Sequence, residues 1–115
     1  MKMTILKNSE INSAQLEAAG VRAGADVGEP QVKTLGLAQE APGNIGIWEC
    51  TPGGWPVNDR EDTEVCYILA GKAQLTDNST VDVVDVSTGD LLILPKGWSG
   101  RWYVTETVKK IYVIY

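Results

Sequence analysis

The sequence has 115 residues, a length that fits one domain with its own hydrophobic core and leaves no room for a second. Hydrophobic residues make up 43% of the chain and charged residues 22%, which is the composition of a globular protein rather than of a disordered one. The net charge is −5, and the ten basic residues are dispersed along the chain. This charge argues against nucleic acid or an anionic membrane as a partner, because both require a basic surface.

No targeting segment is expected, because residues 1–7 contain too short an apolar run for a signal peptide or a membrane span. Cys50 and Cys66 each lie in an apolar, strand-like run and are predicted to be buried, reduced thiols. A disulfide between them is the alternative if their strands are neighbours. Nothing else indicates an oxidising compartment, so we expect a cytoplasmic protein.

The N-terminal third carries one helix signal. Asn12 can cap a helix and Gln15 can reach back to it, which predicts a short helix over residues 13–19 that ends at Gly20. Residues 20–30 contain three glycines and a proline and are interpreted as a loop.

From residue 31 onward the pattern becomes regular, with short apolar stretches separated by Gly, Pro, Asn or Asp. A turn is predicted at residues 41–44 and a hairpin loop at residues 77–80. The predicted strands cover residues 31–38, 45–51, 65–70, 72–76, 81–86, 91–94, 100–106 and 108–115. This spacing is typical of an all-β sandwich or barrel. We expect an N-terminal segment over residues 1–39 and a barrel over residues 40–115.

The stretch 64–71 is apolar on both faces of its strand apart from one carboxylate. The even positions share one face, namely Glu64, Cys66, Ile68 and Ala70. The odd positions share the other face, namely Val65, Tyr67 and Leu69. Both faces should therefore be covered, one by the facing sheet and the other by the N-terminal segment or by a second copy of the chain. This pattern motivates the expectation of a homodimer.

Two spacings resemble the cupin family. Glu64 followed by six residues and Gly71 matches the second half of the first cupin motif, and Gly89, Pro95 and Gly97 match the opening of the second. Residues 40–115 as a whole are similar to the small cupins grouped with the ureidoglycine aminohydrolase cupin domain. The resemblance implies a double-stranded β-helix (an RmlC-like jelly roll) preceded by the short N-terminal helix. It also implies a binding or active site in the lumen of the barrel, and in many members a homodimer.

The chain departs from the metal-binding cupins, which use three histidines and a glutamate, because it contains no histidine. In the cupin pattern, the third histidine falls on Gly100. The first two fall on one of two pairs, depending on the loop length: Val57 with Asp59, or Asn58 with Arg60. Glu64 remains, joined by Asp59 in one of the two registers, and one or two carboxylates cannot hold a transition metal tightly, so we expect no metal ligand set and no cofactor. The metal-dependent ureidoglycine aminohydrolase activity is not carried over.

Tryptophans are the candidates to fill the lumen. Trp98 and Trp102 share the parity of Gly100, and Trp55 precedes the first motif on a loop that could cover the mouth. With Glu64 at the base, such a cage suits a small cationic or hydroxylated ligand through cation–π contacts and charge-assisted hydrogen bonds. The alternative is that the tryptophans simply plug a small barrel.

Glu64 also leaves two interpretations open. It forms a structural bridge with Lys96 or Arg101, or it is unpaired and acts as a general acid or base, with Glu49 as a partner on a neighbouring strand. Cys66 shares the face of Glu64, but a nucleophilic thiol normally needs a nearby base or positive charge.

Three functions remain in view. The first is a metal-independent cupin that binds a small polar molecule, with Trp55, Glu49, Cys66, Lys96, Trp98 and Trp102 as candidate ligand contacts. The second is an enzyme of isomerase, lyase or hydrolase type that uses Glu64 as general acid or base. The third is a structural dimer with a plugged barrel. The sequence favours the first, because a single glutamate is little evidence for catalysis.

Overall fold

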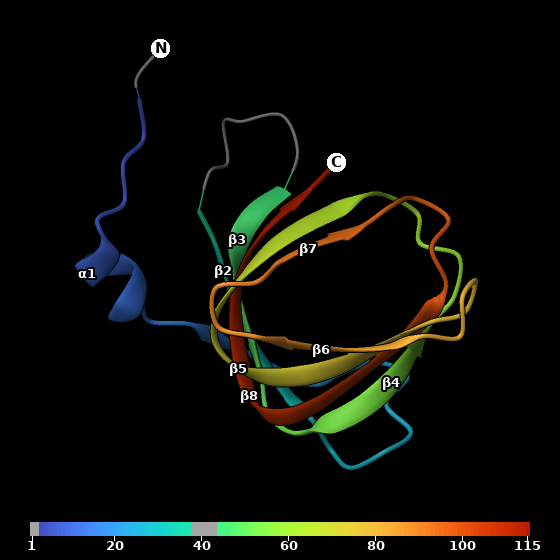
Figure 1. The fold of residues 1–115 in the computed structure, drawn as a ribbon. Coiled ribbons are helices and arrows are strands. Elements are labelled where there is room, and N and C mark those ends of the chain that lie inside the picture. The colour runs from blue at the N-terminus through green and yellow to red at the C-terminus, as the bar shows by residue number, and fades with distance from the viewer. Residues whose placement is uncertain (1–2, 38–43) are drawn as a thin grey trace.

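The computed structural model describes residues 3–37 and 44–115, which form an all-β fold with one short helix (Figure 1). The helix is α1 (Asn8–Asn12). The strands are β1 (Glu17–Val21), β2 (Gln31–Gly36), β3 (Asn44–Cys50), β4 (Gly53–Val57), β5 (Glu64–Asp77), β6 (Val83–Ser87), β7 (Leu91–Leu94) and β8 (Gly100–Ile114). Within this part of the chain, no helix has the length and apolar character needed to cross a membrane.

Two long antiparallel strands, β5 and β8, form the centre of the barrel. They pair with each other along their length. On its other edge β8 pairs with β3 and β4, and on its other edge β5 pairs with β7 and β6. Beyond β3 the sheet continues through β2 to β1. The result is the jelly roll predicted from the sequence, in which the curved strands enclose an interior (Figure 1).

The two central strands bend together near Gly71. Three register shifts between β5 and β8 fall within residues 68–73 of β5. Such irregularities bend a strand and increase its twist, which turns a sheet into a closed barrel. The sequence predicts strands over residues 65–70 and 72–76, and the structure joins them into β5 through this bend. The predicted strands 100–106 and 108–115 are likewise one strand, β8.

The predicted helix over residues 13–19 is wrong. The helix lies earlier, at α1, and residues 17–21 form β1, which pairs with β2. Sheet pairing has overridden a local signal that was only two turns long, as tertiary contacts commonly do. The strand predicted at residues 31–38 is confirmed as β2. The predicted turn at residues 41–44 falls largely outside the described residues.

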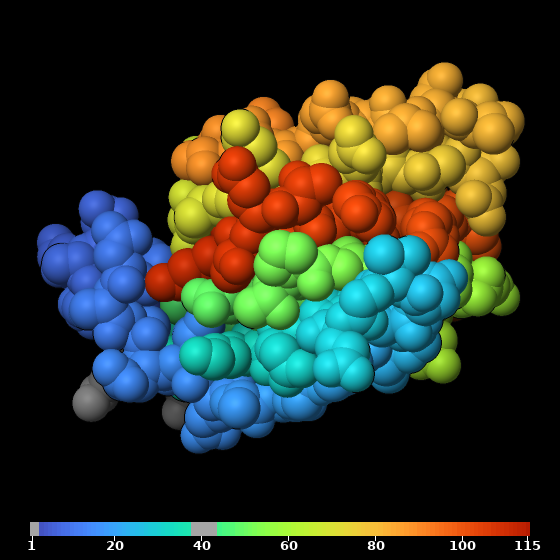
Figure 2. All heavy atoms as spheres, turned by 90° about the horizontal axis from the view of Figure 1, so that it is seen from below, coloured from blue at the N-terminus to red at the C-terminus, as the bar shows by residue number. Residues whose placement is uncertain are grey.

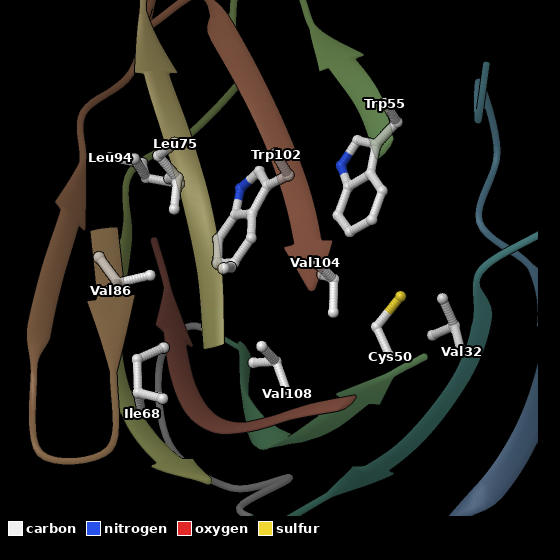
Figure 3. Close-up of a cluster of buried hydrophobic side chains, with 11 residues drawn as sticks. Val32, Cys50, Trp55, Ile68, Leu75, Val86, Leu94, Trp102, Val104 and Val108 are labelled. Carbon is white, nitrogen blue, oxygen red and sulfur yellow. The ribbon is translucent and has the colours of Figure 1, made fainter. Parts of the chain in front are cut away.

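The interior is filled by buried apolar side chains that point inward from seven strands, β2 to β8 (Figure 3). They are Val32, Cys50, Trp55, Ile68, Ala73, Leu75, Val86, Leu94, Trp102, Val104 and Val108. Alternate positions of each strand face this core, as the period-two geometry of a strand requires. In Figure 3, the rings of Trp55 and Trp102 extend into the interior from β4 and β8.

The N-terminal residues gather at one end of the molecule, outside the barrel (Figures 1 and 2). The ammonium of Lys109 on β8 donates a hydrogen bond of 3.0 Å to the carbonyl oxygen of Ile11 in α1. This contact attaches the helix to the outer face of the sheet.

Candidate functional site: a charged cavity in the barrel

A cavity of about 260 Å³ opens into the barrel between β3, β4, β5 and β8. Its walls also include one residue that follows β1 and one from the segment between β4 and β5. The lining residues are Arg22, Asn44, Trp48, Trp55, Val57, Arg60, Glu64, Trp102, Lys110, Tyr112 and Ile114. The cavity therefore combines charged groups with large aromatic surfaces.

Strand register explains why these side chains meet. Trp48 on β3 lies opposite Lys110 on β8, and Lys110 lies opposite Ile68 on β5. Residues opposite each other in an antiparallel sheet project from the same face. The same rule places Trp55 of β4 beside Trp102 of β8. Nine of the eleven lining residues thus lie on strands, and Arg22 and Arg60 come from connecting segments.

Glu64 is buried at the base of the cavity and forms ion pairs with two basic side chains. Its Oε2 lies 2.7 Å from the Nζ of Lys110, and its Oε1 lies 3.2 Å from the Nη1 of Arg60. Glu64 and Lys110 are each only 5% exposed. Burial of a carboxylate is costly unless charge and hydrogen bonds compensate it, and here each oxygen has its own cation.

The predicted partners of Glu64 were Lys96 or Arg101, and that prediction is wrong. Lys96 is exposed at the corner after β7, and Arg101 points to the outside of β8, where its guanidinium pairs with Asp26. The inward positions of β8 are the even-numbered ones, so Lys110 can reach Glu64 whereas Arg101 cannot.

Three tryptophans form one wall of the cavity. The rings of Trp55 and Trp102 are stacked with centroids 5.9 Å apart, and Trp48 lies 6.0 Å from each of them. The Nζ of Lys110 sits 4.2 Å from the Trp48 ring centroid and 4.6 Å from that of Trp102. Lys110 is therefore held by a carboxylate on one side and by two aromatic faces on the other.

Arg22 reaches the cavity from the segment that follows β1. Its guanidinium carbon lies 5.3 Å from the ring centroid of Trp55, and its Nη1 donates a 2.6 Å hydrogen bond to the carbonyl of Ala23. Among the described residues, no carboxylate lies within ion-pair distance of Arg22. Burial lowers the pKa of Arg22 from its ordinary value, because desolvation disfavours the charged form.

The segment that carries Arg22 is attached to β4. The backbone N–H of Asp26 donates to the carbonyl of Gly54 at 3.0 Å, and Val27 forms an antiparallel bridge with the same glycine. The Asp26 carboxylate also accepts a 2.8 Å hydrogen bond from the Nη1 of Arg101. Its hydrogen bonds with Arg101 hold the pKa of the Asp26 carboxyl below its usual value.

Trp55 is not on a loop. It lies in β4, is 2% exposed and contributes to the core. The two glycines before it, Gly53 and Gly54, do not make a turn either. A Cβ at Gly53 would lie 2.6 Å from the ring of Pro30, so glycine is needed there to let residues 22–30 pack closely on the start of β4.

Four residues predicted to belong to the site do not line the cavity, namely Glu49, Cys66, Lys96 and Trp98. Glu49 occupies the opposite face of β3 from Trp48, beside Lys33 and Lys109 in the register. Lys96 is exposed at the corner, in a separate shallow depression that also includes Trp98.

Trp98 packs on the backbone of Gly100, where a Cβ would overlap the indole ring. Trp98 lies at the corner before β8, packs against the hydrophobic core and does not line the cavity. The indole ring of Trp98 therefore occupies the space that a side chain at Gly100 would take.

Cys50 and Cys66 are free, buried thiols, as predicted from the sequence. Burial raises the pKa of each to about 11. Cys66 lies close to Glu64 but does not line the cavity. The raised pKa and the burial are the opposite of the environment that activates a nucleophilic thiol.

We therefore expect neither thiol to react with iodoacetamide in the native protein at pH 9, where a free cysteine, with a pKa near 8.5, is largely ionised. Mass spectrometry after alkylation should find no modified Cys50 or Cys66 until guanidinium chloride is added, when both react. Rapid alkylation of either residue in the native protein would contradict the burial described above.

The residues present do not fit the metal site of the histidine-rich cupins. Both carboxylate oxygens of Glu64 already form ion pairs with basic side chains. Arg60 and Lys110 occupy the positions next to Glu64 from which the other metal ligands would have to come. The described residues contain no group of three or more His, Cys, Asp or Glu side chains arranged to hold a metal ion. Guanidinium and ammonium groups are donors only and cannot ligate a metal.

Comparison with known proteins agrees with this architecture. A family model for the EutQ-like cupin domain matches residues 37–112. The chain belongs to the EutQ-like cupin domain family. A comparison with curated proteins gives no significant match.

Several solved structures share the fold of this cupin. A DUF861-family protein from Pseudomonas syringae pv. tomato DC3000 superposes with a TM-score of 0.80 at 21% identity; the match covers 90% of this chain but 45% of that protein. The Clostridium difficile EutQ protein gives 0.65 at 25% identity, over 75% of this chain and 68% of that one. A DUF861-family protein from Thermotoga maritima gives 0.56 at 35% identity, over 60% of this chain and 76% of that one.

Sequence reasoning missed five of the charged and aromatic residues of this cupin site, namely Arg22, Trp48, Arg60, Lys110 and Tyr112. One signal could have identified Lys110, because it shares strand parity with Val108 and Tyr112 in an otherwise apolar run. A charged residue at an inward position indicates a buried partner. No comparable signal marks Arg22, whose place depends on how its loop packs against β4.

Proposed function

We propose that the cavity is a metal-independent binding site for a small organic molecule. The observation that carries the proposal is the buried Arg60–Glu64–Lys110 cluster, which opens onto a wall of three tryptophans. Ligand sites commonly combine apolar and aromatic walls with a few fixed polar groups. At about 260 Å³ the cavity is smaller than the roughly 300–1,000 Å³ of drug-sized pockets, so the ligand is small.

An enzyme that uses Glu64 as general acid or base is the second candidate, and it has less support. Each oxygen of this carboxylate already contacts a cation, so proton transfer to or from a substrate would require an ion pair to break. The same contacts favour a role for Glu64 in positioning Lys110 and Arg60.

The indole N–H signals of the tryptophans provide a test with an internal control. In a proton–nitrogen correlation spectrum, a ligand in the cavity should shift the signals of Trp48, Trp55 and Trp102 and leave that of Trp98 in place. A panel of small acids, amides, amines and polyols would be screened in this way. The proposal fails if no compound shifts the three cavity signals, or if only the Trp98 signal responds.

We further propose that the chain forms a homodimer through the outer face of β5 and β7. Tyr67, Leu91 and Ile93 on this face are 46%, 63% and 59% exposed. Tyr67 lies opposite Leu91, and Val65 lies opposite Ile93, so the exposed apolar side chains are contiguous. Large apolar patches of this kind commonly mark association sites, and a second copy would cover them.

Sedimentation at micromolar concentration tests the dimer. We expect the mass of two chains for the wild type and of one chain for Leu91→Asp, because a carboxylate at the interface would be desolvated without a partner. Val21→Asp is the matched control, since Val21 is 49% exposed on β1, at the other edge of the sheet. A monomeric wild type, or a dimer that survives Leu91→Asp, would count against this interface.

Three further expectations belong to the same proposal. The ligand is polar, the protein has no nucleic-acid partner, and it works in the cytoplasm. The overall charge of −5 supports the second expectation, and the two free thiols are consistent with the third.

A further inference from the structure

The charges around the cavity are unbalanced. Among the residues that the structure describes, Arg22, Arg60 and Lys110 face a single carboxylate, that of Glu64, so this part of the lining carries two net positive charges. Tyr112 adds no negative charge, because burial raises its pKa above the ordinary value for tyrosine. The whole chain carries −5, so the cavity is a positive site inside an acidic protein.

Arg22 accounts for much of the imbalance. Lys110 and Arg60 are each within 3.2 Å of Glu64, whereas Arg22 has no carboxylate at ion-pair distance in the described part of the chain. Its guanidinium is half-buried against Trp55, and within residues 3–37 and 44–115 its one hydrogen-bond acceptor is the carbonyl oxygen of Ala23. A desolvated guanidinium without a counter-ion is costly, and an anion in the cavity would offset that cost.

We propose that the ligand of this cavity is a small organic anion with a carboxylate group. The acidic group is held by Arg22 together with the outer donors of Arg60 and Lys110, and the apolar part packs against the tryptophan wall. The inference rests on the proposed function and names its ligand class. It replaces the cationic ligand expected from the sequence, because Lys110 already occupies the cation site over Trp48 and Trp102.

The chemistry of the donors supports a carboxylate in particular. A guanidinium presents its N–H groups in a planar fork that matches the two oxygens of a carboxylate. Converging positive groups in a cavity with apolar walls also raise the local concentration of an anion, in a manner that added salt weakens. Glu64 cannot supply this anion to Arg22, because its two oxygens are already engaged.

The first experiment compares three probes of nearly the same shape and different charge: benzoate, benzamide and benzamidine. Titration calorimetry on the full chain should give the tightest binding for benzoate, by roughly tenfold or more over the other two, since hydrogen bonds between charged groups are stronger than those of a neutral amide. The affinity for benzoate should fall as salt is added. Tighter binding of benzamide or benzamidine would overturn the anion inference and leave the proposed binding function intact.

Variants of single basic residues locate the anion. Arg22→Gln should weaken benzoate binding roughly tenfold and leave benzamide unchanged, because only the anion uses the guanidinium charge. Lys33→Gln removes the same charge from an exposed position of β2 and should leave both affinities unchanged. Equal losses in the two variants would overturn the assignment to Arg22. Neither substitution breaks an ion pair in the described structure, so both variants should fold.

A second experiment tests the charge of the cavity without any organic probe. In Trp98→Phe, all remaining indole fluorescence comes from the three cavity tryptophans, and iodide should quench it more strongly than caesium. Equal quenching, or stronger quenching by caesium, would overturn the inference even if some neutral ligand binds. If iodide quenches more strongly and yet no compound in the panel binds, the positive cavity stands and the binding function fails.

Discussion

Replacing Glu64 by glutamine is expected to lower the free energy of unfolding by about 3–5 kcal/mol, the cost of removing one partner from a buried ion pair. The carboxylate is almost fully buried and holds both Lys110 at 2.7 Å and Arg60 at 3.2 Å. Loss of its charge leaves the Lys110 ammonium, only 5% exposed, without a counter-ion. Equilibrium unfolding in urea, monitored by tryptophan fluorescence, measures the change.

Two further variants separate the buried pair from other causes. Asp62→Asn also removes a carboxylate next to Arg60, but Asp62 is 47% exposed, and the expected change is below about 1 kcal/mol. The double variant Glu64→Leu/Lys110→Met removes both charges and should recover much of the stability lost in Glu64→Gln, because an apolar pair often replaces a buried ion pair at little cost. A loss below about 1 kcal/mol for Glu64→Gln would contradict the role assigned to the cluster.

Gly71→Ala should cost about 2–5 kcal/mol, from roughly 1–2 kcal/mol of backbone strain plus 1–3 kcal/mol of overpacking. Gly71 has a φ of +91° at the bend of β5, where a side chain is strained. A Cβ there would also overlap the carbonyl group of Thr107 and the Cα of Val108 on β8. The backbone would have to move at the point where the two central strands bend together.

Gly89 and Gly36 are matched controls for the two contributions. Gly89 also has a φ of +91°, but its Cβ would meet only the Tyr67 hydroxyl, at 4.0 Å, so Gly89→Ala should show the strain alone, about 1–2 kcal/mol. No described atom would lie within 4 Å of a Cβ at Gly36, and Gly36→Ala should change stability by less than about 1 kcal/mol. If urea unfolding gives equal losses for Gly71→Ala and Gly89→Ala, the close approach of β5 and β8 would not be the cause.

The barrel could be predicted because its signals are local. Apolar runs bounded by turn residues located the strands, and the spacing of Glu64 to Gly71 and of Gly89 to Gly97 indicated a cupin, which the family match confirms. The finer resemblance to ureidoglycine aminohydrolases and the boundary at residue 40 stay predictions. The helix at residues 13–19 was wrong because pairing with β2, which no local pattern encodes, makes residues 17–21 a strand.

The site was less predictable because it depends on register. Glu64 and two of the cavity tryptophans could be identified from motif position and parity. Their partners come from β3 and from the far end of β8, and a sequence does not give the pairing that brings Trp48 and Lys110 together. Trp55 was predicted on a loop, but it lies in β4, and the close packing of Gly53 on Pro30 at the start of this strand has no local signal in the sequence.

Metal-independent binding is the central claim, and calorimetry on chelator-treated protein tests it most directly. The chain would be incubated with EDTA, desalted and titrated with benzoate, before and after addition of Zn²⁺ or Ni²⁺. We expect the same affinity in all samples, because Arg22, Arg60 and Lys110 need no metal to hold a carboxylate. Binding that disappears after chelation and returns with stoichiometric metal would contradict the account and place a metal ion at Glu64.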